Sequence, residues 1–348
     1  MNPLSPLPIS GALAGGEPDP RRRRRRRRRF ALAALLLGAV VLPAWWQIAR
    51  PSFPAGPIRL PAWLAATATP SPSPRPATPS PRPSATATPW APAVGVVSPP
   101  APFFRFGRPF DPPDLALPAN SYLYGTNAEG SLLLHHGNDL GAGAGTEVRS
   151  IGDGTVAYAG EDEARRFGPT FDFFGRLVIV RHDATLDGQP LYSLYGHLAS
   201  TRVRYGQKVQ RGAAIGTVGM AGIALGPHLH LEVRTAAVDY EATRNPLLFL
   251  APVPGTGAVV ARVRDAVGRP LPGALVGLFA LDGGERWIAN SRTYPAEHVH
   301  PTAPFDENLV FSDLPPGRYA LSMVHHSAPV RTEVIVPADG VAFAVLAP

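Results

Sequence analysis

The chain has 348 residues, 45% of them apolar, which is enough for two folded domains with sizeable cores. Its net charge of +7 comes from one segment, because residues 1–50 hold ten of the 33 Lys and Arg residues but only two of the 26 Asp and Glu residues. Residues 51–348 therefore carry 23 basic and 24 acidic side chains, which argues against nucleic-acid binding. The absence of cysteine excludes disulfide bonds, thiolate zinc sites, thiol catalysis and a lipid-modified cysteine anchor.

The N-terminal segment has the pattern of a membrane anchor. Residues 1–29 end in nine consecutive arginines, and residues 30–46 are seventeen uncharged, mostly apolar residues, FALAALLLGAVVLPAWW. As a helix these seventeen residues would span about 25 Å, close to the thickness of a bilayer core. We predict a cytoplasmic Arg-rich segment at 1–29 and an uncleaved transmembrane signal anchor at 30–49, with the rest of the chain outside the cytoplasm. The alternative is a cleaved signal peptide.

Residues 50–100 are rich in Pro, Ser, Thr and Ala, and the tetrapeptide Ser-Pro-Arg-Pro occurs at Ser73 and again at Ser80. Such a composition cannot bury enough apolar surface to fold, and its prolines favour an extended polyproline II conformation. We predict a disordered linker that lifts a folded domain off a membrane. Recognition by a proline-binding domain is the alternative.

The remaining sequence predicts a mainly β protein. In residues 101–250, short β-rich runs alternate with glycine turns and no long amphipathic helix interrupts them, which favours an antiparallel β-sheet domain. We expect its strands at 148–160, 176–183, 190–198, 213–219 and 228–234. After the Pro-rich joint at 252–254, residues 256–348 predict a small β-sandwich in which few contacts cross to the preceding domain. We expect its strands at 257–265, 274–281, 318–324, 331–337 and 341–347.

Six of the ten histidines fall between residues 135 and 230, and five of these six lie in three clusters, at 135–139, 195–197 and 226–230. His228 and His230 are two apart on an expected strand, so both side chains point to one face, although a pair of this kind alone is a weak signal. His135 and Asp139 would lie about 13 Å apart on a regular strand, too far to share one ion. Glycine and asparagine at the intervening positions tolerate a bend that brings them together.

A zinc site with three protein ligands and one open position could therefore use His135, Asp139 and one histidine of the 228/230 pair. The remaining histidine of that pair, together with His197, could position or deprotonate water and stabilise an oxyanion. Spacing alone does not decide between His228 and His230.

Several motifs in a fixed order resemble those of the lysostaphin-type (LytM-domain) zinc metallopeptidases. They cover about 120 residues: HHGND (135–139), GTEV (145–148), DGTV (153–156), LYGHL (194–198), GQKVQRGAAIG (206–216) and GPHLHLEVR (226–234). The resemblance implies a β-sheet groove that cleaves cell-wall peptides, with His135, Asp139 and His230 as zinc ligands. It also implies that His197 and His228 are the catalytic pair. The 160–175 segment departs from the family pattern, and loops at such positions wall the groove.

Other polar residues have more ordinary interpretations. We expect His136 and His182 to be structural, and the four histidines after residue 290 to be exposed loop residues. Glu232 shares the face of His230, either as its hydrogen-bond partner or as an acid paired with an arginine. The stretches at 268–279 and 313–321 resemble carboxypeptidase-regulatory-like β-sandwich modules, which implies a binding or spacing role for the C-terminal module.

The sequence thus predicts a membrane-anchored, outward-facing enzyme of a bacterial cell. We expect a Zn²⁺-dependent endopeptidase that hydrolyses the peptide cross-links of peptidoglycan. The first alternative is a non-catalytic wall-binding or hydrolase-activating module with a structural zinc. The second is a surface adhesion protein in which the terminal sandwich is the working part.

Overall fold

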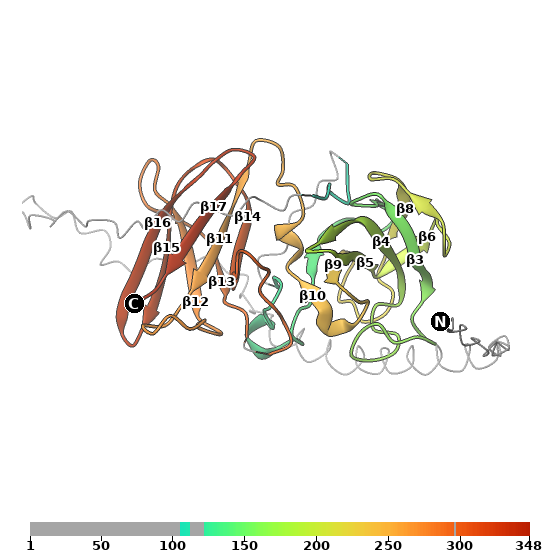
Figure 1. Cartoon of the computed structure of the whole chain (residues 1–348), viewed down its shortest axis with the longest axis horizontal. Coiled ribbons are helices and arrows are strands. Elements are labelled where there is room, and N and C mark those ends of the chain that lie inside the picture. Colours follow the sequence, from blue (N-terminus) through green and yellow to red (C-terminus); the bar gives the residue numbers. More distant parts are fainter. Residues whose placement is uncertain (1–104, 112–121, 296) are drawn as a thin grey trace, which may run out of the picture. The chain divides into compact units, whose positions relative to one another are not determined.

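The computed structural model describes residues 105–111, 122–295 and 297–348. These residues form a mainly β structure, as expected, with a few single turns of 3₁₀ helix (Figure 1). Within the described part of the chain, no helix is long and apolar enough to span a membrane. The Arg-rich segment, the transmembrane anchor at 30–49 and the linker at 50–100 lie outside the described residues and stay predictions.

The first region is built on a seven-stranded sheet in which all pairings are antiparallel. Its order is β1-β9-β5-β4-β3-β7, and β10 also pairs with β9 (Figure 1). A smaller sheet has the order β2-β8-β6. The strands are β1 (Asn138–Leu140), β2 (Glu147–Arg149), β3 (Gly154–Glu161), β4 (Arg176–Leu186), β5 (Gln189–Gly196), β6 (Leu198–Thr201), β7 (Lys208–Val209), β8 (Ala214–Val218), β9 (Leu229–Thr235) and β10 (Thr243–Arg244).

Two of the expected strands are each divided into two. The run at 148–160 becomes β2 and β3, which belong to different sheets, because the Ile151–Asp153 turn lies between them. The run at 190–198 becomes β5 and β6, which separate at His197, whose φ of 62° is in the left-handed region. Apolar residues occur on both sides of each break, so the sequence pattern alone does not show the breaks. The 3₁₀ turns are η2 (Ala128–Gly130), η3 (Tyr240–Ala242) and η4 (Pro246–Leu248).

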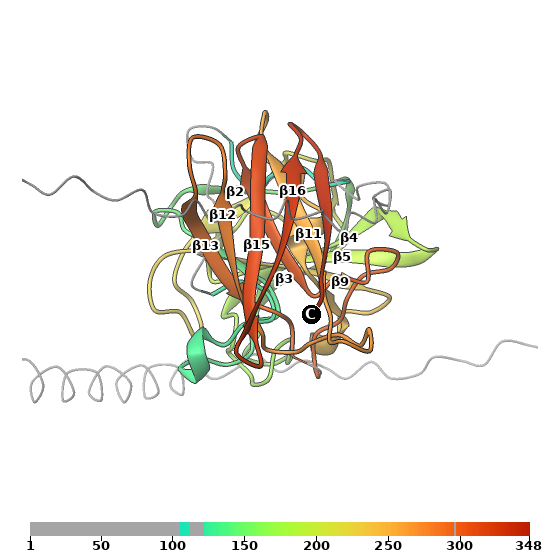
Figure 2. The same cartoon turned by 90° about the vertical axis from the view of Figure 1, so that its left-hand side faces the viewer.

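The C-terminal module consists of two sheets. A three-stranded sheet has the order β14-β11-β17 (Figure 1), and a four-stranded sheet has the order β13-β12-β15-β16 (Figure 2). The strands are β11 (Gly257–Val263), β12 (Leu275–Ala280), β13 (Arg286–Arg292), β14 (Leu309–Leu314), β15 (Gly317–His325), β16 (Ala328–Val336) and β17 (Val341–Leu346). All five expected strands are present. β13 and β14 were missed; β13 is a polar edge strand with only two buried residues.

The expectation that few contacts cross the joint at 252–254 is wrong. The described residues belong to one compact unit, and a single apolar core continues from the first region into the C-terminal module. Val260, Phe305 and Val310 of the module belong to the same buried cluster as Leu247 and Leu250. The first region thus covers an apolar face of the β14-β11-β17 sheet. A strand pattern shows that a face is apolar but does not show which segment packs against it.

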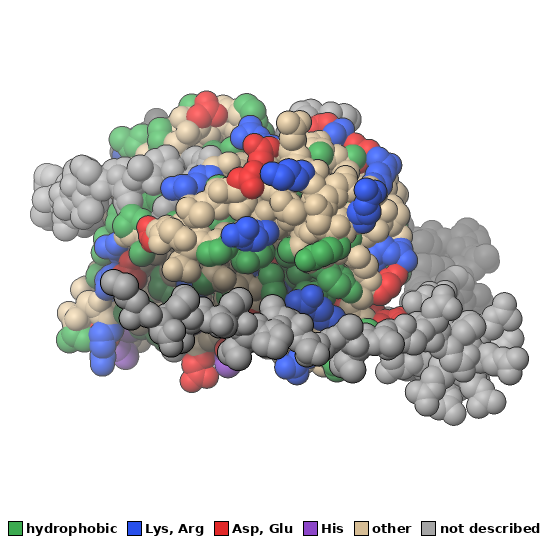
Figure 3. Space-filling model, turned by 45° about the vertical axis from the view of Figure 1, so that its right-hand side comes forward, with side chains coloured by type: hydrophobic (Ala, Val, Ile, Leu, Met, Phe, Trp, Pro, Cys, Tyr) green, Lys and Arg blue, Asp and Glu red, His purple; other side chains and the backbone are tan. Residues whose placement is uncertain are grey.

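Polar contacts cross the joint as well. Arg108 forms a largely buried ion pair with Asp313, and Asp313 Oδ1 also accepts a hydrogen bond of 2.9 Å from the backbone N–H of Val253. On the surface, Arg292 forms a bidentate ion pair with Glu129. On the face shown in Figure 3, acidic and basic side chains are interspersed, as the nearly balanced charge of residues 51–348 leads one to expect.

Candidate metal centre

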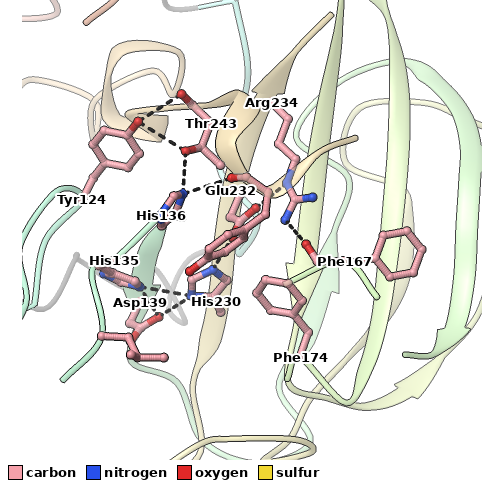
Figure 4. A network of polar contacts seen from close by, with 12 residues as sticks. Tyr124, His135, His136, Asp139, Phe167, Phe174, His230, Glu232, Arg234 and Thr243 are labelled. Atoms are coloured by element: carbon pink, nitrogen blue, oxygen red, sulfur yellow. Dashed lines mark hydrogen bonds and ion pairs between the residues drawn. The ribbon is translucent and has the colours of Figure 1, made fainter. Parts of the chain in front are cut away.

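The register between β1 and β9 places two of the expected ligands opposite each other. Asp139 is the direct cross-strand partner of His230. Residues directly opposite in an antiparallel pair project from the same face of the sheet with their Cβ atoms close together. The result is a distance of 2.9 Å between Asp139 Oδ1 and His230 Nδ1 (Figure 4).

His135 reaches the same point from the segment that precedes β1. Its backbone pairs with Gly125 and Thr126, and its Nε2 lies 3.1 Å from Asp139 Oδ1 and 3.1 Å from His230 Nδ1. The close approach depends on Gly137. A Cβ at that position would lie 2.5 Å from the Leu231 carbonyl oxygen and 2.8 Å from the His230 ring, so no larger residue fits there without a shift.

Hydrogen bonds on the far side of each ring determine which nitrogen faces the cluster. His135 Nδ1 donates to the carbonyl oxygen of Tyr122 at 2.8 Å, and His230 Nε2 donates to Glu232 Oε1 at 3.1 Å. In the neutral rings, His135 Nε2 and His230 Nδ1 therefore carry lone pairs that point toward each other and toward the Asp139 carboxylate.

This arrangement fits a metal ion. Three lone-pair donors that converge within about 3 Å repel one another unless a cation lies between them. Donor atoms of a tetrahedral zinc site with bonds of 2.0–2.1 Å are about 3.3 Å apart, close to the separations of 2.9–3.1 Å. Among the residues that the structure describes, these three form the one cluster of at least three side chains able to hold a metal ion.

The charges around the cluster favour the same interpretation. Burial opposes ionisation of Asp139, but its contacts with the rings of His135 and His230 outweigh burial and hold the pKa of its carboxyl far below the usual range. Burial lowers the pKa of His230, yet Asp139 and Glu232 on its two sides outweigh burial and raise that pKa to about 9.

Behind His230 lies an ion pair with no solvent exposure. The carboxylate of Glu232 bridges His230 Nε2 and the Arg234 guanidinium, whose Nε lies 2.5 Å from Glu232 Oε2 (Figure 4). Burial raises the pKa of Glu232, but Arg234 outweighs it and lowers that pKa to about 2. Both interpretations of Glu232 are therefore correct at once: it orients the imidazole and it pairs with an arginine.

The two expected catalytic histidines face each other beside the cluster. The ring centroids of His197 and His228 are 4.8 Å apart, and His228 Nε2 lies 3.5 Å from Asp139 Oδ1. His197 Nδ1 donates to the carbonyl oxygen of Ala221, and His228 Nδ1 donates to that of Gly226, each at 2.8 Å. In both neutral rings the lone pair is therefore on Nε2. Burial and the neighbouring rings of His230 and His228 lower the pKa of His197 to about 3, so its neutral ring is a proton acceptor.

The left-handed backbone at His197 is rare for a residue with a side chain and marks a position that the surroundings force. A contact that holds His197 in this conformation comes from the 160–175 segment. The backbone N–H of His197 donates to the carbonyl oxygen of Phe174 at 2.9 Å, and the Phe174 ring lies 5.2 Å from that of His230. The 160–175 segment thus contacts His197 through a backbone hydrogen bond and His230 through the Phe174 ring.

Sequence reasoning missed three residues that support the site. Tyr122 stacks on His135 at a centroid distance of 3.9 Å, Phe174 packs on His230, and Arg234 holds Glu232. A signal existed only for Arg234, since alternation along β9 places it on the same face as His228, His230 and Glu232. Tyr122 and Phe174 lie in loops, where no periodicity indicates which way a side chain points.

The other histidines make ordinary contacts. His136 Nδ1 bonds to the Tyr240 carbonyl and the Thr243 hydroxyl, away from the metal cluster (Figure 4). His182 is held between the Asp153 carbonyl and Ser193 Oγ. His298 forms an exposed pair with Glu241. These contacts agree with structural roles.

Comparison with known proteins identifies a family for the part of the chain that carries the five candidate site residues. Residues 133–243 match the sequence model of Peptidase family M23, and this range includes all five candidate site residues. These residues form an M23 peptidase domain. The C-terminal module lies outside the matched range, and its resemblance to carboxypeptidase-regulatory-like modules stays a prediction.

The M23 domain is similar to part of several larger proteins. It is 39% identical over 116 residues to the cell division protein DipM of Caulobacter vibrioides, which covers 33% of this chain and 17% of DipM. It is 32% identical over 133 residues to the peptidoglycan DD-endopeptidase ShyA of Vibrio cholerae, covering 38% of this chain and 28% of ShyA. The chain therefore spans less than a third of the length of either relative.

A solved structure with likeness to this one is the catalytic domain of lysostaphin from Staphylococcus simulans, with 25% identity and a TM-score of 0.30. The match covers 37% of this chain and 86% of that domain.

Proposed function

We propose that this protein is a zinc-dependent endopeptidase that hydrolyses peptide cross-links of bacterial peptidoglycan. The observation that carries the proposal is the cluster of His135, Asp139 and His230, whose lone pairs converge beside two further histidines with free Nε2 atoms. The M23 domain and its similarity to a peptidoglycan DD-endopeptidase support the substrate class.

His135 Nε2, His230 Nδ1 and one oxygen of Asp139 would hold the zinc. When bound, zinc supplies a Lewis acid that lowers the pKa of water and polarises the scissile carbonyl. Glu232 and the Tyr122 carbonyl keep the two ligand rings in the tautomers that present lone pairs.

His197 and His228 perform the proton transfers. An Nε2 lone pair of this pair takes the proton of the attacking water, and the protonated ring then donates it to the leaving amine. The second ring donates a hydrogen bond to the oxygen that becomes negatively charged during attack, provided that it carries a proton on Nε2. The acceptors Ala221 and Gly226 hold the rings in place while the protons move.

The cellular location follows from the N-terminal pattern. We propose a single-pass anchor at 30–49 with the M23 domain outside the cytoplasm, where peptidoglycan lies. The linker at 50–100 would let the domain reach the wall at up to about 3 Å per residue.

The test is digestion of purified peptidoglycan by the full chain, with soluble products separated and weighed. We expect peptide cross-links to be cut, activity to be lost on chelation and regained with zinc, and Asp139→Ala to be inactive. A protein that retains one zinc but releases no peptide product would instead be the non-catalytic wall-binding or activating module.

A further inference from the structure

A cavity of about 640 Å³ lies between two loops of the protein, and its volume is within the range of small-ligand sites. One wall is the 165–169 part of the segment between β3 and β4, and the other is the loop 238–241 that follows β9. His136, the sequence neighbour of the ligand His135, also lines the cavity. The cavity wall is therefore continuous along the chain with the candidate ligand His135.

The first wall carries positive charge that the protein does not neutralise. Arg165 and Arg166 both line the cavity, and neither forms an ion pair with an acidic residue in the described part of the chain. The guanidinium of Arg165 instead lies 4.8 Å from the centroid of the Phe167 ring, a cation–π contact that holds it in place. Two guanidinium groups of this kind form a donor site for a carboxylate.

The opposite wall carries negative charge. Asp239 precedes η3 but its side chain makes no capping hydrogen bond, and it forms no ion pair within the described residues. Glu241 pairs only with the exposed ring of His298. The cavity thus has arginine side chains on one wall and acidic side chains on the other, and the exposed side chain of Leu133 also lines it.

Both walls are fastened to the same buried side chain. Arg234 donates to the Phe167 carbonyl at 3.0 Å and to the Val238 carbonyl on the other wall (Figure 4 shows the first contact). Arg234 also holds Glu232, which bonds the ligand His230. The spacing of the walls is therefore set by the same ion pair that orients a metal ligand, which makes the cavity a built part of the site.

We propose that this cavity binds a zwitterionic part of the substrate, namely a peptide segment with a free carboxylate and a free amine on the same residue. The carboxylate meets Arg165 and Arg166, and the ammonium group meets Asp239 and Glu241. This inference rests on the proposed function and adds a substrate preference to it. Wall peptides whose diamino acid keeps both groups free have the required chemistry, and their amidated or acetylated forms do not.

The experiment is calorimetric titration of the full chain, purified in detergent, with a tetrapeptide that contains a diamino acid with a free amine and a free carboxylate. The second ligand is the same peptide with the amine acetylated and the carboxylate amidated. We expect the zwitterionic form to bind at least about tenfold more tightly. Arg166→Gln and Asp239→Asn should each reduce this preference by about fivefold. The matched control is Arg181→Gln, which removes an exposed arginine outside the cavity and should keep the preference.

Equal affinity of wild-type protein for the two peptides would overturn the inference, as would an unchanged preference in both cavity variants. The same titration separates this result from the proposed function, because it requires no cleavage. A protein that keeps the preference but cuts no cross-link would contradict the endopeptidase proposal and support the binding site.

Discussion

Replacing Tyr294 by Phe tests whether the C-terminal module helps to build the metal centre. The Tyr294 hydroxyl accepts a hydrogen bond of 2.8 Å from Asn245 and donates one of 3.4 Å to Glu307. Asn245 in turn accepts from Asn138, which directly precedes the candidate ligand Asp139 in β1. A chain of buried polar contacts thus runs from the module to the strand that carries Asp139.

The magnitude follows from burial. Tyr294, Asn245 and Glu307 are each at most 4% exposed, so water cannot replace the lost hydroxyl. A buried polar group left without its partner costs about 1–3 kcal/mol of unfolding free energy. The aromatic ring stays, with its edge-to-face contact to Tyr124 at 5.1 Å, so the substitution creates no large cavity. If about 1 kcal/mol of this loss in free energy is passed to Asp139 through Asn138, the affinity for zinc falls by about fivefold.

The assay combines denaturant unfolding with competition for zinc by a chelator. Tyr319→Phe is the matched control, because it also removes a tyrosine hydroxyl from the module, but this hydroxyl bonds the Pro315 carbonyl outside the network. We expect both variants to be destabilised and only Tyr294→Phe to bind zinc more weakly. Wild-type zinc affinity in Tyr294→Phe would show that the network does not reach the metal centre.

Three further predictions concern the metal, the catalytic pair and pH. Asp139→Ala should lose bound zinc by metal analysis, and stoichiometric zinc in this variant would remove Asp139 from the ligand set. His197→Ala should keep zinc but lose about a hundredfold in turnover, whereas loss of zinc would make His197 a ligand. Burial raises the pKa of Glu307 from 4.5 to about 8, so the folded protein holds a proton there that the unfolded chain releases. The stability that this protonated group contributes is present below pH 4.5 and is lost as pH rises toward 8. Glu307→Gln should therefore flatten this part of a plot of melting temperature against pH. An unchanged slope in this variant would refute the raised pKa of Glu307.

The candidate ligands and the candidate catalytic pair could be proposed from the sequence because each of these residues lies in a short, recognisable motif. Alternation along β9 places His228, His230 and Glu232 on one face, and the order of histidine motifs resembles one family of metallopeptidases. The structure brings His135, Asp139 and His230 together as expected, although the reason for glycine at 137 is close contact with His230 as well as chain flexibility.

Strand positions were also largely predictable, because alternation and glycine turns are properties of short segments. The failures occurred where a pattern continues through a change of direction, as at His197, and where a strand is polar, as in β13. The division at 252–254 correctly separated two sets of strands, but it did not predict that their apolar faces pack against each other.

The sequence by itself therefore determined the mainly β fold, the candidate ligands and the candidate catalytic pair. Only the tertiary structure decided which nitrogen each histidine presents, because the acceptors at Tyr122, Ala221 and Gly226 are loop carbonyls that no side-chain pattern marks. It also decided that Arg234 joins both cavity walls to the metal centre and that Tyr294 joins the C-terminal module to it. The physical reason is that periodicity reports which residues share a face, whereas contacts between distant segments depend on how those faces pack.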